Sequence, residues 1–133
     1  MSENTCGASI LCVDDDWSIL AIHKSLLEAA GYRVLTAQNT QEALQLFTAE
    51  PVDLVITDHY LEGKMTGAAL AKQLKLARPE VPVLWMSGSI DPPSSKTQFD
   101  GFLYKAARAH VWFKEIERVL HAAQAKASKQ KPA

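Results

Sequence analysis

The sequence predicts an α/β protein built on a doubly wound, parallel sheet. Short apolar runs alternate along the chain with amphipathic segments, which is the order expected of strands joined by right-handed crossover helices. Residues 54–57 are apolar on both faces, as in strands that helices cover from both sides. Polar residues end several of the runs, at the edge of the sheet where such proteins bind ligands.

The first half of the chain is expected to hold three strands and two helices. The predicted strands are residues 10–13, 32–35 and 54–57. The first helix covers residues 17–30, and Gly31 suits the position just after its end. The second helix begins at Asn39 or Thr40, either of which can cap it, and ends before Pro51.

The second half continues the alternation, with one interruption. The predicted elements are a helix at residues 67–77, a strand at 83–86, a strand at 102–104 and a helix at 109–125. Between the two strands, residues 89–101 contain the adjacent Pro92 and Pro93 and few apolar positions. We therefore expect an irregular loop or one short turn there rather than a full helix.

Length and composition indicate one globular domain. The chain has 133 residues, of which 47% are hydrophobic and 22% charged. We expect the domain at residues 9–125, between a flexible leader at 1–8 and a flexible tail at 126–133. The formal net charge of −1 argues against binding nucleic acid or a membrane surface by bulk electrostatics. With neither a signal sequence nor a metal-type cysteine pair, a reducing cytoplasm is the expected location.

Charged and polar residues stand at the ends of four predicted strands. They are Asp14 and Asp15, Asp58, Ser87, and Lys105. Clustered carboxylates repel one another, so three of them at one edge indicate a compensating cation, and all-oxygen ligands suit Mg²⁺. With the ion bound, a carboxylate can attack a phosphoryl group, while an ammonium and a hydroxyl bind the remaining oxygens.

These segments resemble the receiver domain of two-component response regulators. The matching segments, in family order, are residues 13–16 (VDDD), 54–58 (LVITD), 65–67 (MTG), 83–88 (VLWMSG) and 102–105 (FLYK). The resemblance covers residues 10–125. It implies a flavodoxin-like fold with five parallel strands in the order 2-1-3-4-5, helices on both faces, and a fourth helix that is short or missing.

The resemblance also implies the chemistry of the site. Asp58 would accept the phosphoryl group. Mg²⁺ would be held by Asp14, Asp15, Asp58 and the backbone carbonyl of Tyr60. Lys105 would pair with the acyl phosphate. Two features depart from the family pattern. Ala106 follows Lys105 where the family usually has proline, which predicts a trans peptide and a less constrained position of the Lys105 side chain. The altered segment before the fifth strand affects the surface through which the family usually signals.

The family's switch residues would be Ser87, which senses the phosphoryl oxygen, and Phe102. A buried core aromatic is an equally good interpretation of Phe102, a turn residue is the plain alternative for Ser87, and a solvated lysine is the alternative for Lys105. Asp16 is expected to cap the first helix, beside the two metal ligands. The tryptophans are expected to be packing residues; they are Trp17, Trp85 and Trp112. Trp17 could also lie near the metal.

The expected function is that of a phosphoacceptor rather than an enzyme, with at most self-phosphorylation and autodephosphorylation. Its partners would be a histidine kinase or histidine phosphotransfer protein and an unknown downstream protein. Because no output segment fits after Ala125, the chain is expected to be a stand-alone receiver, or one cut from a hybrid kinase, that signals by partner binding or phosphorelay. One alternative is a receiver-like interaction module that works without phosphorylation. The other alternative is a phosphatase of the haloacid dehalogenase type. Such enzymes have a second aspartate two residues after the nucleophile, where this chain has Tyr60, and this argues against it.

Overall fold

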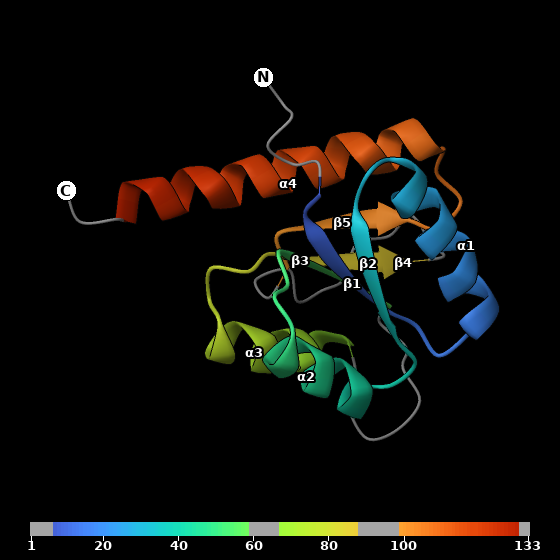
Figure 1. Cartoon of the computed structure of the whole chain (residues 1–133), viewed down its shortest axis with the longest axis horizontal. Helices are drawn as coiled ribbons and strands as arrows, with labels where there is room; N and C mark the ends of the chain where they lie inside the picture. Colours follow the sequence, from blue (N-terminus) through green and yellow to red (C-terminus); the bar gives the residue numbers. More distant parts are fainter. Residues whose placement is uncertain (1–6, 59–66, 88–98, 131–133) are drawn as a thin grey trace.

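The computed structural model describes residues 7–58, 67–87 and 99–130, which form a five-stranded sheet with four helices (Figure 1). Every strand pairing is parallel, and the order β2-β1-β3-β4-β5 confirms the predicted topology. The strands are β1 (Ser9–Val13), β2 (Arg33–Ala37), β3 (Leu54–Asp58), β4 (Val83–Ser87) and β5 (Gly101–Tyr104). The helices are α1 (Trp17–Ala29), α2 (Thr40–Ala49), α3 (Gly67–Ala77) and α4 (Ala109–Gln130).

The last helix differs from the prediction. Helix α4 continues to Gln130, past the expected end at Ala125, and at about 1.5 Å per residue its 22 residues run well beyond the short strands (Figure 1). Among the residues described, no helix combines the length and the apolar character that crossing a membrane requires. Of the irregular segment predicted at residues 89–101, residues 89–98 lie outside the described residues, and Gly101 already belongs to β5.

Helix α1 begins and ends where local chemistry favours it. The Asp16 carboxylate accepts hydrogen bonds from the amides of Ser18 and Ile19 at 3.0 and 3.4 Å, which confirms Asp16 as the N-cap. Gly31 has a φ of 99°, a left-handed conformation that glycine adopts at little cost, and it follows the end of the helix as predicted. The start of α1 is therefore fixed directly behind the aspartate run.

Two hydrophobic clusters, one on each face of the sheet, form the core. Alternate residues of β1 divide between them: Ile10 and Cys12 face one cluster, and Leu11 and Val13 the other. The first cluster includes residues of α1 and α4, and the second includes residues of α2 and α3, which cover the opposite face (Figure 1). Burial on both faces explains why the central strands read as continuous apolar runs.

Candidate functional site

The predicted site residues meet because the sheet is parallel. Asp14 directly follows β1, Asp58 and Ser87 are the last residues of β3 and β4, and Lys105 directly follows β5. Parallel strands all end at one edge, so these four side chains start from neighbouring positions. In the register, Val13 of β1 lies opposite Thr57, and Ser87 lies opposite Tyr104.

Three carboxylates form an acidic cluster at this edge. Oxygen atoms of Asp14, Asp15 and Asp58 all lie within 4.8 Å of one another. The side chain of Asp14 is 1% exposed and that of Asp58 is 12% exposed, so water screens their repulsion poorly. Asp14 Oδ1 accepts a hydrogen bond from the amide of Asp16 at 3.0 Å, which holds the first carboxylate against the start of α1.

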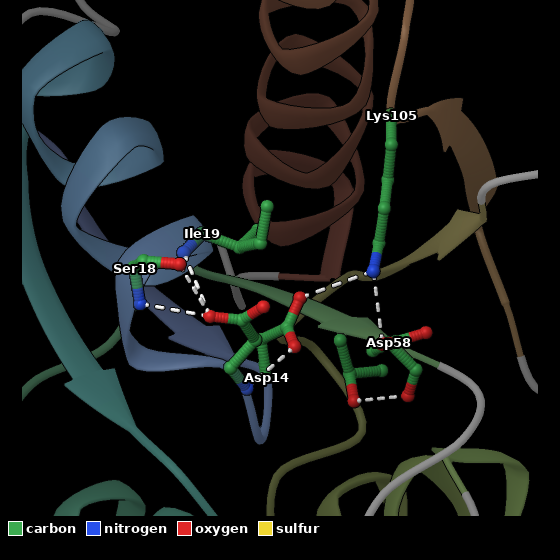
Figure 2. Close-up of polar contacts among 7 residues, drawn as sticks. Asp14, Ser18, Ile19, Asp58 and Lys105 are labelled. Atoms are coloured by element: carbon green, nitrogen blue, oxygen red, sulfur yellow. Dashed lines mark hydrogen bonds and ion pairs between the residues drawn. The ribbon is translucent and has the colours of Figure 1, made fainter.

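Lys105 supplies the positive charge at the cluster. Its Nζ atom lies 3.0 Å from Oδ2 of Asp58 and 3.2 Å from Oδ2 of Asp14, and Figure 2 shows the ammonium reaching both carboxylates. Burial by itself would lower the pKa of Lys105, but the hydrogen bond to Asp58 and the charges of Asp58 and Asp14 outweigh it, so the pKa lies above its ordinary value. Lys105 is therefore a firmly charged ammonium at neutral pH.

The donor set fits a hard divalent cation. One ammonium offsets one of the three carboxylates, which leaves a formal charge of about −2 at the cluster. Oδ2 of Asp14 is buried, and no well-aligned hydrogen bond reaches it from the described part of the chain, although Lys105 lies close by. Carboxylate oxygens are the ligands that Mg²⁺ prefers, and Asp14, Asp15 and Asp58 are the residues that would hold it.

The backbone around Lys105 is held by a set of hydrogen bonds. The amide of Lys105 donates to the carbonyl of Ser87 at 2.7 Å. The carbonyl of Tyr104 accepts from the amide of Ala107 at 3.0 Å and from the indole Nε1 of Trp112 at 2.9 Å. The described residues contain no cis peptide, so the bond between Lys105 and Ala106 is trans, as expected.

The remaining predicted residues have varied surroundings. Ser87 is half-buried at the end of β4, and the Tyr60 carbonyl lies outside the described residues. Phe102 is 43% exposed on β5, so its interpretation as a buried core aromatic is wrong. Trp17 is 69% exposed, which corrects its interpretation as a packing residue, whereas Trp85 and Trp112 are buried as expected. The exposure arises because α1 turns the residue after its cap toward solvent.

The sequence did not predict a contact between two buried residues, His23 and Trp112, near the site. The ring of His23 on α1 lies 4.5 Å from the ring of Trp112 on α4, and both side chains are buried. The sequence predicted only that Trp112 is a packing residue. The contact between them and the hydrogen bond of the Trp112 indole to Tyr104 depend on how the two helices pack, for which the chain carries no local signal.

The fold and the acidic edge together define a receiver domain. The sequence pattern of the response regulator receiver domain matches residues 10–117, so the chain belongs to this family. Receiver domains are signalling domains of two-component systems, and this assignment confirms the class that the strand-end residues indicated.

Named relatives agree with this class. The chain is 37% identical, over 78 residues, to the alkaline phosphatase synthesis transcriptional regulatory protein PhoP of Bacillus subtilis. The matched segment covers 59% of this chain and 32% of PhoP. A CheY-like receiver domain from Methanospirillum hungatei has a similar structure, with a TM-score of 0.81 and 26% identity over 90% of this chain and 98% of that one. NtrX from Brucella abortus gives a TM-score of 0.86 and 27% identity over 96% of this chain and 30% of NtrX. The chain thus spans less than a third of the length of PhoP or NtrX.

Proposed function

We propose that this receiver domain accepts a phosphoryl group on Asp58 from a phosphohistidine of a histidine kinase or a phosphotransfer protein, in a Mg²⁺-dependent reaction. The observation that carries the proposal is the position of Asp58. Its carboxylate is largely buried at the end of a strand, 3.0 Å from the Lys105 ammonium and within the same cluster as two further carboxylates. No simple surface aspartate requires such surroundings.

The chemistry needs little more than position and charge. An Asp58 oxygen would attack the phosphorus, the bond from phosphorus to the donor's imidazole nitrogen would break, and the imidazole would keep that electron pair as it leaves. The product is an acyl phosphate on Asp58. A bound Mg²⁺ would offset negative charge on the transferred group.

Residues around the acceptor would divide the remaining tasks. Lys105 already contacts an Asp58 oxygen and would exchange that contact for an oxygen of the phosphoryl group. The Ser87 hydroxyl, at the end of the neighbouring strand, would donate to another phosphoryl oxygen. Autodephosphorylation follows if water later attacks the acyl phosphate.

The phosphorylated domain would act through a downstream protein or pass the phosphoryl group to another histidine. Ser87 and Phe102 are the proposed switch residues. Phe102 supports this proposal because 43% of the residue is exposed on β5, an edge strand of the sheet, where a partner can detect its position. Ser87 ends β4 and Lys105 follows the neighbouring β5, so both side chains start from the same edge of the sheet.

The test is to incubate the protein with Mg²⁺ and acetyl phosphate, or with a phosphorylated kinase, and to look by intact mass for a base-labile phosphoryl adduct. We expect the adduct in the wild type and in the control Glu80→Gln, which alters an exposed carboxylate. Asp58→Asn should lose it, and a chelator should prevent it. An adduct that persists in Asp58→Asn would overturn the acceptor assignment. Absence of both the adduct and Mg²⁺ binding in the wild type would favour a phosphorylation-independent interaction module.

A further inference from the structure

We propose that Trp112 is a positioning residue for Lys105. Its indole N–H holds the peptide from which the Lys105 side chain starts, and His23 in turn holds the indole. The inference rests on the proposed function, because Lys105 is taken to assist phosphoryl transfer to Asp58. It assigns to a buried helix residue a role in the chemistry at the edge of the sheet.

The first step concerns one peptide unit, the one that joins Tyr104 to Lys105. Its N–H group donates to the Ser87 carbonyl at 2.7 Å, and its C=O group accepts from the Trp112 indole at 2.9 Å. A peptide unit is planar, so hydrogen bonds at both ends fix the orientation of the whole plane. One end is tied to β4 and the other to α4.

The second step concerns the strength of the indole contact. Trp112 is 1% exposed, so water is not available to replace its hydrogen bond to the Tyr104 carbonyl. The same carbonyl also accepts from the amide of Ala107 at 3.0 Å. Loss of the indole N–H would leave the carbonyl with the Ala107 amide as its remaining partner at the turn that precedes α4, and the peptide plane would be held less firmly.

The third step concerns how the indole is held. The His23 ring lies 4.5 Å from the Trp112 ring with an interplanar angle of 39°, and His23 is 6% exposed. His23 belongs to α1, whose N-cap is Asp16 and whose first turn lies directly behind Asp14. The ring contact therefore joins the helix that follows the carboxylates to the helix that orients the lysine.

The fourth step connects the peptide to the chemistry. The ammonium of Lys105 must stay near Oδ2 atoms of Asp14 and Asp58, at 3.2 and 3.0 Å, from the end of a flexible four-carbon stem. A small tilt at the start of that stem displaces Nζ by a larger distance. Because misplacement by about 1 Å can cost about 100-fold in rate, a partial loss of anchoring should be visible in phosphoryl transfer.

The first experiment compares the wild type with Trp112→Phe. This substitution keeps an aromatic ring against His23 and removes the indole N–H. We expect the rate of phosphorylation by acetyl phosphate at saturating Mg²⁺ to fall about three- to tenfold. The Mg²⁺ dissociation constant, measured by calorimetry, should stay within about twofold, because the carboxylates do not move. The control Phe113→Leu alters core packing at the next position of α4 and should keep the wild-type rate.

A double mutant separates positioning from general structure. In a Lys105→Met background, Trp112→Phe should not lower the residual rate further, because the group that it positions is absent. Equal loss in both backgrounds would overturn the proposal, as would a wild-type rate in Trp112→Phe. A matching loss in Phe113→Leu would also overturn it, because that result assigns the effect to helix packing.

A third measurement does not depend on phosphorylation, so it distinguishes failure of this inference from failure of the proposed function. By NMR, the indole proton of Trp112 should exchange slowly with solvent in the wild type. Trp112→Phe should shift the Lys105 amide and side-chain resonances more than Phe113→Leu does. If the wild type forms no adduct, the proposed function fails, and these shifts still decide the positioning role. Fast exchange of the indole proton, or unshifted Lys105 resonances, would overturn it.

Discussion

The Nζ atom of Lys105 lies 3.0 Å from Oδ2 of Asp58, and this ion pair spans from the end of β5 to the end of β3 across β4. The same ammonium reaches Asp14 at 3.2 Å. Lys105 thus holds together carboxylates that would otherwise repel each other where water is largely excluded. We expect the metal-free site to depend on this ammonium, and that dependence can be measured.

Replacement of Lys105 by methionine should destabilise the metal-free protein. The stem is kept and the charge removed, so Asp14 and Asp58 are left facing each other, and we expect the free energy of unfolding to fall by about 1–3 kcal/mol. Added Mg²⁺ should reduce the loss, because the ion offsets the same charges. Denaturant unfolding with a chelator and with Mg²⁺ measures both values.

The control for this variant is Lys24→Met, which removes a surface ion pair with Glu28 and should change stability by less than about 0.5 kcal/mol. The pKa of Lys105 lies above its ordinary value of 10.5, so its contribution is complete below that value and is lost only as the pH rises through the higher folded pKa. The difference between variant and wild type should therefore be constant from about pH 7.5 to pH 9, above the range in which His23 titrates. A difference that disappears within that range would contradict this account.

Replacement of Asp15 by asparagine should have the opposite effect on the metal-free protein. Asp15 lies within the acidic cluster, so neutralising it removes repulsion, and we expect a gain of about 0.5–1 kcal/mol in a chelator. The same change should abolish stabilisation by Mg²⁺, which we expect for the wild type to reach about 2.7 kcal/mol at 100 times the dissociation constant. Thermal unfolding with and without MgCl₂ tests both effects, with Glu80→Gln as control. Full Mg²⁺ stabilisation in Asp15→Asn would remove this residue from the metal site.

Much of the site could be predicted from the sequence because its residues are tied to strand ends. Once residues 54–58 are assigned to a buried parallel strand, the position of Asp58 follows from topology, and the same holds for Asp14 and Lys105. The cap at Asp16 was predictable because it depends on contacts within three residues. Strand order and local capping are properties that composition and spacing carry.

What could not be predicted depends on packing between distant elements. The indole of Trp112 and the ring of His23 are 89 positions apart in the sequence, and only the packing of α4 beside α1 brings them together. Likewise, the exposure of Phe102 follows from the place of β5 at the edge of the sheet, where no further strand or described helix covers the residue fully. Hydrophobic character alone does not tell a covered position from an edge position.

Replacement of Asp16 by alanine should separate capping from metal binding. Asp16 accepts from the amides of Ser18 and Ile19, and its loss should lower the melting temperature by a few °C while the Mg²⁺ dissociation constant stays within about twofold. Asp16→Ser, which can still cap, should recover most of the loss. The bonds from the Ser18 hydroxyl and amide hold the pKa of Asp16 below its ordinary value of 3.8, so its contribution is complete above that value and is lost as the pH falls through the folded pKa. A strong loss of Mg²⁺ affinity would instead make Asp16 part of the metal site.

His23 should make stability depend on pH in the weakly acidic range. Burial holds the pKa of His23 below its ordinary value of 6.5; the charge of Asp14 raises it and that of Lys105 lowers it, but burial has the largest effect. The unfolded chain therefore takes up the proton first, and stability falls as the pH drops below about 6.5 toward the folded pKa, by at most about 1.4 kcal/mol per pH unit.

His23→Phe keeps an aromatic ring against Trp112 and removes the titrating group, so its stability should fall less than that of the wild type between about pH 7.5 and pH 5.5. His121→Gln, a change at an exposed position of α4, should keep the wild-type slope. Urea unfolding at several pH values in a chelator measures the slopes. The two proteins differ only in the imidazole at position 23. Equal slopes in His23→Phe and the wild type would therefore show that titration of this imidazole does not cause the pH dependence.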